Sequence, residues 1–219
     1  MKLKNIKAVL YDWDDTIINT KASVTQLLKD FSNNQNLSPL TDDLLKTHWG
    51  KPVPAMLSSF WPDENITELV KKFFDSVSDS FSPKPFDDVG ETLKGLERKG
   101  LLLGVVSSTP KRAFEQVIKI YPEVHSPNYF HIQTAEDCEF FKPDPRVFDM
   151  VISKLEKEGI KKSQVVYVGD GLYDFEAAKN RNLTFVAVTT GFISREEFIK
   201  KGLNEKLILN NFSELKNLL

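Results

Sequence analysis

The 219-residue sequence predicts an α/β fold, in which a parallel sheet is covered by helices and an all-helical segment is inserted after the first strand. From Phe86 onward, short apolar runs alternate with amphipathic stretches, as in a parallel sheet with right-handed crossovers. Between residues 19 and 85 the sequence has helical patterns and no strand pattern. These two observations predict the fold class and the place of the insertion.

The first strand is predicted over Ala8–Tyr11, an apolar run typical of a strand buried on both faces of a sheet. Asp12, Asp14 and Asp15 follow it directly. Because burying unpaired carboxylates is costly, we expect them at the strand end, where ligands bind in open α/β sheets. Asp12 and Asp14 project to the same side of an extended chain, and two converging carboxylates suit Mg²⁺. The alternative is an acidic turn without further function.

Helices are expected at three places in the insertion. Val24–Phe31 and Asp42–Thr47 have helical spacing, and an apolar stripe over Ile66–Phe81 predicts a third helix, which two prolines would end. The chain is expected to turn at Gly50–Pro54. The aromatic stripe is interpreted as packing rather than as a binding surface.

After the insertion, each predicted strand is followed by a helix. Strands are expected over Leu101–Val106, Phe130–Gln133, Gln164–Val168 and Leu183–Val188, with an edge strand at Leu207–Leu209. Helices are expected over Val89–Leu96, after a Thr109 cap with Pro110 in first position, after Asp144-Pro145, around Phe175–Ala178 and from Ser213.

Polar residues follow several of these strands, and one sheet would bring them to a common edge. Ser107 ends the second strand, Asp170 and Asp174 follow the fourth, and Lys142 precedes the helix at Asp144. This set suits phosphoryl transfer: Asp12 would attack phosphorus, and Asp14 would protonate the leaving oxygen and then deprotonate water. A divalent cation and Lys142 would offset the negative charge, and Ser107 would bind a phosphate oxygen. Asp170 would complete the metal site, and Asp174 would orient Lys142 or a metal-bound water.

The sequence resembles the haloacid dehalogenase superfamily over nearly its whole length. Asp12–Thr16 is similar to its DxDxT motif, Val105–Ser107 to its second motif, Phe141–Pro145 to its third-motif lysine and Gly169–Asp174 to its GDxxxD motif. The resemblance implies a Rossmann-like core over residues 1–18 and 86–219 and a helical cap over 19–85, as in phosphoglycolate phosphatase and β-phosphoglucomutase-like members.

The resemblance also implies the residue roles. It makes Asp12 the nucleophile and Asp14 the acid/base, with Mg²⁺ held by Asp12, the Asp14 main-chain carbonyl and Asp170. The chain departs from the family pattern at Asp15, where glycine is usual, at Phe141, where a small residue is usual, and at Ser108, where Asn is usual. Aspartate tolerates left-handed backbone geometry better than most residues, so Asp15 is compatible with the motif.

Several site residues have simpler alternative interpretations. Asp174 could cap the helix that follows, Lys142 could be a surface lysine, and Ser108 competes with Ser107 for the phosphate. His48, His125 and His131 lack metal-ligand spacing and are interpreted as structural or surface residues. Cap residues proposed for specificity are Lys51, His48, Phe60 and Trp61.

Composition narrows the function classes. The net charge is -2 without a basic block, which argues against nucleic acid or an anionic membrane as partner. No apolar run is long enough to span a bilayer, and the single cysteine, Cys138, fits a reducing cytosol. We therefore expect a cytoplasmic protein. The residues suited to phosphoryl transfer make a small phosphorylated metabolite its expected partner. Whether it is a monomer or a dimer stays open.

The predicted function is Mg²⁺-dependent hydrolysis of a small phosphate monoester through an aspartyl-phosphate. A mutase of the same family would use the same groups, and a catalytically silent module that binds partners through the cap is a third possibility. A dehalogenase would need no Mg²⁺ and no acid at the place of Asp14, so Asp14 and Asp170 count against it. A phosphonate hydrolase would need a cap lysine, for which Lys29 and Lys51 are the formal candidates. A dinucleotide-dependent oxidoreductase is disfavoured because no G-x-G-x-x-G follows the first strand.

Overall fold

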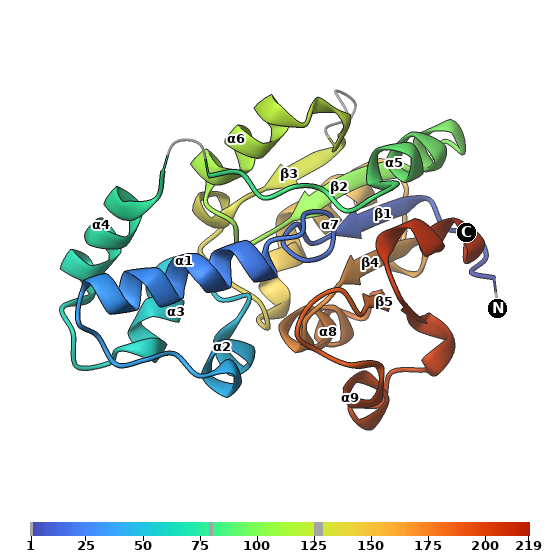
Figure 1. The fold of residues 1–219 in the computed structure, drawn as a ribbon. Helices are drawn as coiled ribbons and strands as arrows, with labels where there is room; N and C mark the ends of the chain where they lie inside the picture. Colours follow the sequence, from blue (N-terminus) through green and yellow to red (C-terminus); the bar gives the residue numbers. More distant parts are fainter. Residues whose placement is uncertain (1, 79–80, 125–128) are drawn as a thin grey trace.

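A computed structural model describes residues 2–78, 81–124 and 129–219. In this part of the chain a six-stranded, all-parallel sheet has the order β3-β2-β1-β4-β5-β6, with helices on both faces (Figure 1). The strands are β1 (Ala8–Tyr11), β2 (Leu102–Val106), β3 (His131–Gln133), β4 (Val165–Gly169), β5 (Thr184–Val188) and β6 (Ile208–Leu209). The predicted Rossmann-type α/β fold is confirmed.

Strand β1 lies in the middle of the sheet and pairs with both β2 and β4. Its two neighbours are far apart in sequence, so the strand order reverses at β1. Such a reversal opens a crevice at the carboxyl ends of the strands, which is where ligands bind in open α/β sheets. The residues after Tyr11 therefore lie at the position where this sheet is expected to bind a ligand.

The two faces of the sheet bury different residues of β1. Val9 and Tyr11 belong to one apolar cluster, which α5 (Val89–Arg98), α6 (Lys111–Ile120) and the C-terminal 3-10 turns of Phe212–Asn217 complete. Ala8 and Leu10 belong to the other, with α7 (Asp149–Lys157), α8 (Leu172–Arg181) and α9 (Arg195–Lys200). Because all four residues of β1 are buried, the strand is held firmly from both sides.

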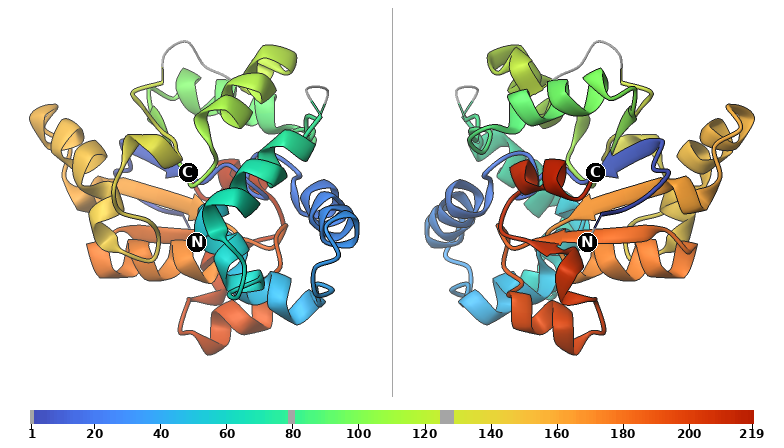
Figure 2. Two further views of the ribbon diagram at one scale, coloured as in Figure 1. Left: turned by 90° about the vertical axis from the view of Figure 1, so that its left-hand side faces the viewer. Right: turned by 90° about the vertical axis from the view of Figure 1, so that its right-hand side faces the viewer.

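Helices α1 to α4 gather beyond one end of the sheet (Figures 1 and 2). They are α1 (Lys21–Asn34), α2 (Asp42–His48), α3 (Val53–Phe60) and α4 (Ile66–Ser76). Their apolar faces form a cluster of their own around Leu28, Leu45 and Leu57. The chain enters and leaves this group side by side, since the Asn19 amide donates to the Lys84 carbonyl at 2.8 Å.

Two predictions about these helices were wrong. Helix α3 was not expected, because Pro52 and Pro54 indicated a turn; the structure places Pro52 at the N-cap and Pro54 in the first turn, where proline costs no hydrogen bond. Helix α4 ends at Ser76 rather than at Phe81. There the Val77 amide donates to the Phe74 carbonyl at 3.3 Å, while the Phe73 carbonyl accepts from the Ser76 hydroxyl at 2.7 Å, a local bond that competes with helix continuation.

Other boundaries also differ from the sequence predictions. Thr109 does not cap α6, because Pro110 is the N-cap residue and the Thr109 side chain is bonded elsewhere. Helix α9 was not predicted, and the C-terminal helix is made of 3-10 turns. The remaining short 3-10 helices are Pro122–Val124, Ala135–Asp137, Pro145–Phe148, Lys162–Gln164 and Glu205–Leu207. Within the described ranges, no helix is long and apolar enough to cross a bilayer; the cytoplasmic location stays a prediction.

The packing of β1 leads to a stability prediction. Replacing the buried Leu10 by alanine leaves a cavity beneath the site, so Leu10→Ala should lower the free energy of unfolding in urea by about 2 to 5 kcal/mol. Ile199 is 42% exposed, so Ile199→Ala should change it by no more than about 0.5 kcal/mol. Equal losses in the two variants would contradict the central position of β1.

Candidate active site

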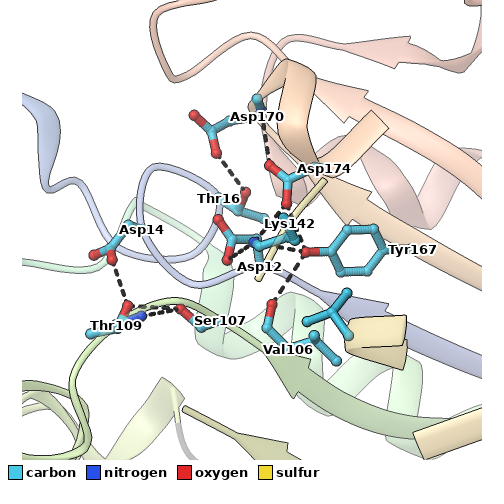
Figure 3. A network of polar contacts seen from close by, with 12 residues as sticks. Asp12, Asp14, Thr16, Val106, Ser107, Thr109, Lys142, Tyr167, Asp170 and Asp174 are labelled. Atoms are coloured by element: carbon cyan, nitrogen blue, oxygen red, sulfur yellow. Dashed lines mark hydrogen bonds and ion pairs between the residues drawn. The ribbon is translucent and has the colours of Figure 1, made fainter. Parts of the chain in front are cut away.

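The ends of β1, β2 and β4 bring the predicted site residues together (Figure 3). The amide of Asp12 donates to the Val168 carbonyl at 2.9 Å, which continues the pairing of β1 with β4 by one residue. On the other side, Ser107 follows β2 directly. Asp12, Ser107 and Asp170 are each at most 7% exposed. Three strand ends thus place polar side chains in one small buried volume.

Lys142 connects two of the carboxylates. Its Nζ lies 2.7 Å from Asp12 Oδ1 and 2.7 Å from Asp174 Oδ1, and it donates to the Tyr167 hydroxyl at 3.1 Å. Burial alone would lower the pKa of Lys142, but Asp12 and Asp174 raise it above its usual range. The side chain is therefore a buried, charged ammonium. The alternative of a surface lysine is excluded.

Asp174 has two contacts, one for each interpretation that the sequence left open. Its Oδ2 accepts from the Gly171 amide at 3.0 Å at the start of α8, and its Oδ1 binds Lys142. The end of β4 lies so close to this carboxylate that only glycine fits at position 169, because a Cβ on Gly169 would lie 2.6 Å from the Asp174 side chain. The residue both caps a helix and holds the lysine.

Asp170 lies beside these groups in a tight enclosure. Thr16 Oγ1 is 3.5 Å from Asp170 Oδ1, and a Cβ on Gly191 would lie only 1.8 Å from Oδ2. Gly191, in the loop after β5, is therefore a requirement for the position of Asp170. No sequence pattern had pointed to it.

The carboxylates form a cluster that fits a divalent cation. Oxygens of Asp12, Asp170 and Asp174 lie within 4.8 Å of one another, and such hard oxygen donors suit Mg²⁺. Burial raises the pKa of Asp12 to about 7, although Lys142 lowers it, and raises the pKa of Asp170 well above its usual range, with Asp15 and Asp174 adding to the effect. One ammonium is too little positive charge for this cluster, and a bound cation would favour its ionised form. The predicted ligands Asp12, Asp14 and Asp170 stay a prediction, to which the geometry adds Asp174.

The Asp14 carboxylate is hydrogen-bonded by Thr109, which was predicted to cap a helix instead. Its Oδ2 accepts from Thr109 Oγ1 at 2.5 Å, and the Thr109 hydroxyl also lies 2.7 Å from Ser107 Oγ. Burial raises the pKa of Asp14, although the bond from Thr109 lowers it. A carboxyl whose pKa is raised is suited to proton transfer near neutral pH.

A cavity of about 220 Å³ opens above these groups and extends toward α1, α3 and α4. Ser107, Ser108 and Lys142 line its lower part, and Lys51 lines the upper part. Lys51 contacts His48 Nδ1 at 2.8 Å. Of the other cap residues proposed for specificity, Phe60 and Trp61 are not among the described lining residues and are buried in the apolar cluster of α1 to α4.

The remaining histidines are away from the carboxylates. His131 is buried in β3, and its Nε2 lies 3.3 Å from Gln133 Oε1. His125 lies outside the described residues. Among the described residues, no histidine belongs to a group that could hold a metal.

A family model described as haloacid dehalogenase-like hydrolase matches residues 9–188. The chain belongs to this family. Its membership confirms the resemblance deduced from the four motifs, and the prediction of an enzyme of the hydrolase class.

Individual relatives of this hydrolase are named as phosphatases. An N-acetylmuramic acid 6-phosphate phosphatase from Pseudomonas aeruginosa is 25% identical over 203 residues, covering 90% of this chain and 88% of the relative. A phosphoglycolate phosphatase from Agrobacterium fabrum is 24% identical over 193 residues, covering 84% and 80%. The solved structure of a predicted phosphoglycolate phosphatase from Haemophilus somnus superposes with a TM-score of 0.81 at 18% identity, covering 98% of both chains, which shows a shared fold. The two curated names support the phosphoric monoester class.

The hydrolase departs from its family pattern at Asp15, and the structure explains how. Asp15 has φ 52°, the left-handed conformation that aspartate was expected to tolerate. Its buried side chain accepts from the Lys21 amide at 2.8 Å through Oδ1 and from Trp49 Nε1 at 2.9 Å through Oδ2. The carboxylate thus joins the loop after β1 to α1 and to the end of α2.

Tyr167 is a further contact residue that the sequence analysis missed. Its hydroxyl lies 2.8 Å from Asp174 Oδ1 and 3.2 Å from the Val106 carbonyl, in addition to its contact with Lys142. A signal was present, because a tyrosine inside a buried strand needs a partner for its hydroxyl. For Thr109, a following proline indicated a helix start and concealed the contact with Asp14.

The bond between Trp49 and Asp15 can be measured. In a double-mutant cycle with Trp49→Phe and Asp15→Asn, we expect a coupling free energy of about 1 to 3 kcal/mol in urea unfolding, because the bond involves a buried charged group. Trp61→Phe is the matched control, since Trp61 Nε1 donates to the Ser38 carbonyl, and its coupling with Asp15→Asn should be near zero. The same coupling for both tryptophans would show that Trp49 does not recognise the carboxylate.

Proposed function

We propose that this hydrolase is a Mg²⁺-dependent phosphatase that cleaves a small phosphate monoester through an aspartyl-phosphate on Asp12. The observation that supports this best is the Asp12 carboxylate at the base of the cavity, 2.7 Å from the Lys142 ammonium and beside Asp170 and Asp174. Relatives named as phosphatases of N-acetylmuramic acid 6-phosphate and of phosphoglycolate support the reaction class.

The reaction would proceed in two steps. First, an Asp12 oxygen forms a bond to phosphorus while the bond from phosphorus to the alcohol oxygen breaks, and Asp14 gives its proton to that oxygen. The alcohol leaves neutral. Second, Asp14 takes a proton from water as the water oxygen attacks phosphorus, and the bond between Asp12 and phosphorus breaks. Inorganic phosphate is released and Asp14 is protonated again.

Neighbouring residues would support both steps. The Thr109 hydroxyl, bonded to Asp14 Oδ2, orients the carboxyl that moves the proton. Ser107 and Lys142 are proposed to bind phosphate oxygens, with Ser108 as an additional donor at the cavity wall. Asp174 keeps the Lys142 ammonium beside Asp12 through its own 2.7 Å contact.

Mg²⁺ is the proposed cofactor. Asp12, Asp170 and the main-chain carbonyl of Asp14 would hold it, with Asp174 close by. When bound, it supplies positive charge that offsets the charge of the phosphate next to these carboxylates. Without such charge, a phosphate anion would be repelled by the cluster.

The domain organisation is part of the proposal. Residues 1–18 and 86–219 would form the core and residues 19–85 a cap that closes over the cavity and limits access of water. The separate apolar cluster of α1 to α4 supports this division, as does the pairing of the two crossing segments near Ile17 and Phe86.

Removing the nucleophile tests the function. Asp12→Asn should lower phosphate release from p-nitrophenyl phosphate, phosphoglycolate and sugar phosphates by on the order of a thousandfold or more, because no covalent intermediate can form. Asp42→Asn is the control, since the exposed Asp42 pairs with Lys29 at the surface and should leave turnover unchanged. Undiminished turnover by Asp12→Asn would rule out the aspartyl-phosphate. Phosphate that moves to a second hydroxyl without release would indicate a mutase, and magnesium binding without any turnover would indicate the silent binding module.

The metal site has its own test. Gly191→Ala places a methyl group on Asp170, so Mg²⁺ affinity measured by calorimetry should fall about tenfold or more, and turnover should become more sensitive to EDTA. Gly95→Ala adds the same group in α5, where the nearest atom is 3.9 Å away, and should not change the affinity. Unchanged affinity in Gly191→Ala would mean that Asp170 does not hold the cation.

A further inference from the structure

The cavity above Asp12 has two chemically different parts. Its base carries the carboxylates, the Lys142 ammonium and the serine hydroxyls described above. Its upper part is formed mainly by apolar side chains of three helices. These are Val24 and Leu27 of α1, Val53 and Met56 of α3, and Phe73 and Phe74 of α4.

Phe74 is the most informative of these residues. It is 42% exposed, whereas its neighbour Phe73 is 4% exposed and packs edge-on against Phe31 in the apolar cluster of the four helices. Phe73 thus has the packing role that was predicted for the aromatic stripe of α4. Phe74 also lines the cavity, and its larger exposed fraction leaves apolar surface in contact with water.

Two polar side chains of the cavity wall, Lys51 and Gln116, already contact other residues of the protein. Lys51 Nζ contacts His48 Nδ1 at 2.8 Å and donates to Ser59 Oγ at 3.0 Å. On the α6 side, Gln116 donates to the Phe81 carbonyl at 2.9 Å. Because apolar side chains make up most of this part, a sugar-like ligand with several hydroxyls would leave some of them unpaired here, and burying unpaired hydroxyls is costly.

We infer that the substrate is a phosphate monoester whose alcohol carries an apolar group, aliphatic or aromatic, which fills the upper part of the cavity. This inference rests on the proposed function for the reaction at the phosphate. The phosphate would lie at the polar base and the apolar group against Val53, Met56 and Phe74. Covering these side chains removes apolar surface from water on both partners, which favours binding of such an ester over a polar one of equal length.

Binding can be tested without turnover. Ethyl-, butyl- and hexylphosphonate, which cannot be hydrolysed at the C–P bond by this route, are titrated into the Mg²⁺-loaded wild-type protein by calorimetry. We expect affinity to rise by about fourfold for each added methylene until the cavity is full. Affinity that is flat or falls with chain length overturns the inference, whatever the catalytic activity.

Hydrolysis of matched esters then separates the inference from the proposed function. Ethyl, butyl, hexyl and 2-phenylethyl phosphate have similar leaving alcohols, and glycerol 3-phosphate is the polar comparison. We expect kcat/KM for the hexyl and phenylethyl esters to exceed that for glycerol 3-phosphate at least about tenfold. A preference for glycerol 3-phosphate overturns the inference while the phosphatase stands. If no ester is cleaved but affinity rises along the phosphonates, the proposed reaction is overturned, whereas the preference of the cavity for an apolar group on a phosphate-like ligand stands.

A variant in the cavity wall identifies where the apolar group lies. Phe74→Ser should reduce the ratio of hexyl- to ethylphosphonate affinity about threefold or more and leave ethylphosphonate affinity unchanged. Met150→Ser on α7 is the control, because Met150 is 46% exposed and lies outside the described lining residues, and it should leave the ratio unchanged. An unchanged ratio in Phe74→Ser would overturn the proposed position.

Discussion

The Lys142 ammonium is the group on which the arrangement of the site depends. Its Nζ lies 2.7 Å from a carboxylate oxygen of Asp12, which follows β1, and 2.7 Å from one of Asp174 in α8. Without it the two carboxylates would repel each other in a buried volume, and breaking such a pair typically costs about 3 to 5 kcal/mol. The ion pairs therefore bring the strand β1 end, the α8 start and the segment before α7 to one place. The same contacts keep the nucleophile candidate beside the charge that a phosphate needs.

A second carboxylate connects this centre to the helices above it. Asp15 follows the two catalytic candidates directly, and its side chain binds the α1 start and Trp49. The end of α2 also contacts the rest of the molecule at three places: Trp49 packs against Phe192, the Tyr173 hydroxyl donates to the Thr47 carbonyl, and Lys46 pairs with Glu197. The proposed cap is thus tied to the loop that carries the chemistry. Trp49, at the end of α2, is thus one hydrogen bond away from Asp15, which is bonded covalently to Asp14.

Prediction from the sequence was most accurate where a single local pattern decides the structure. The bounds of β1 were predicted correctly, and Asp12 and Asp170 were correctly placed just after strand ends. Buried strands and clustered acids leave few alternatives. It failed where two local signals compete. Pro52 and Pro54 can end a helix or begin one, and the sequence does not say which. At the end of α4, the Ser76 hydroxyl competes for the Phe73 carbonyl, and periodicity cannot detect such a side-chain bond.

By itself, the sequence determined the fold class, the order of the strands and the positions of Asp12 and Asp170 after strand ends, since these follow from periodicity and from the cost of burying charge. Only the tertiary structure decided the contacts between distant segments. The bond from Thr109 to Asp14, the Tyr167 hydroxyl beside Lys142 and the approach of Gly191 to Asp170 each join residues far apart in the chain. Such contacts depend on how helices and strands pack against one another, and no spacing within one segment encodes them.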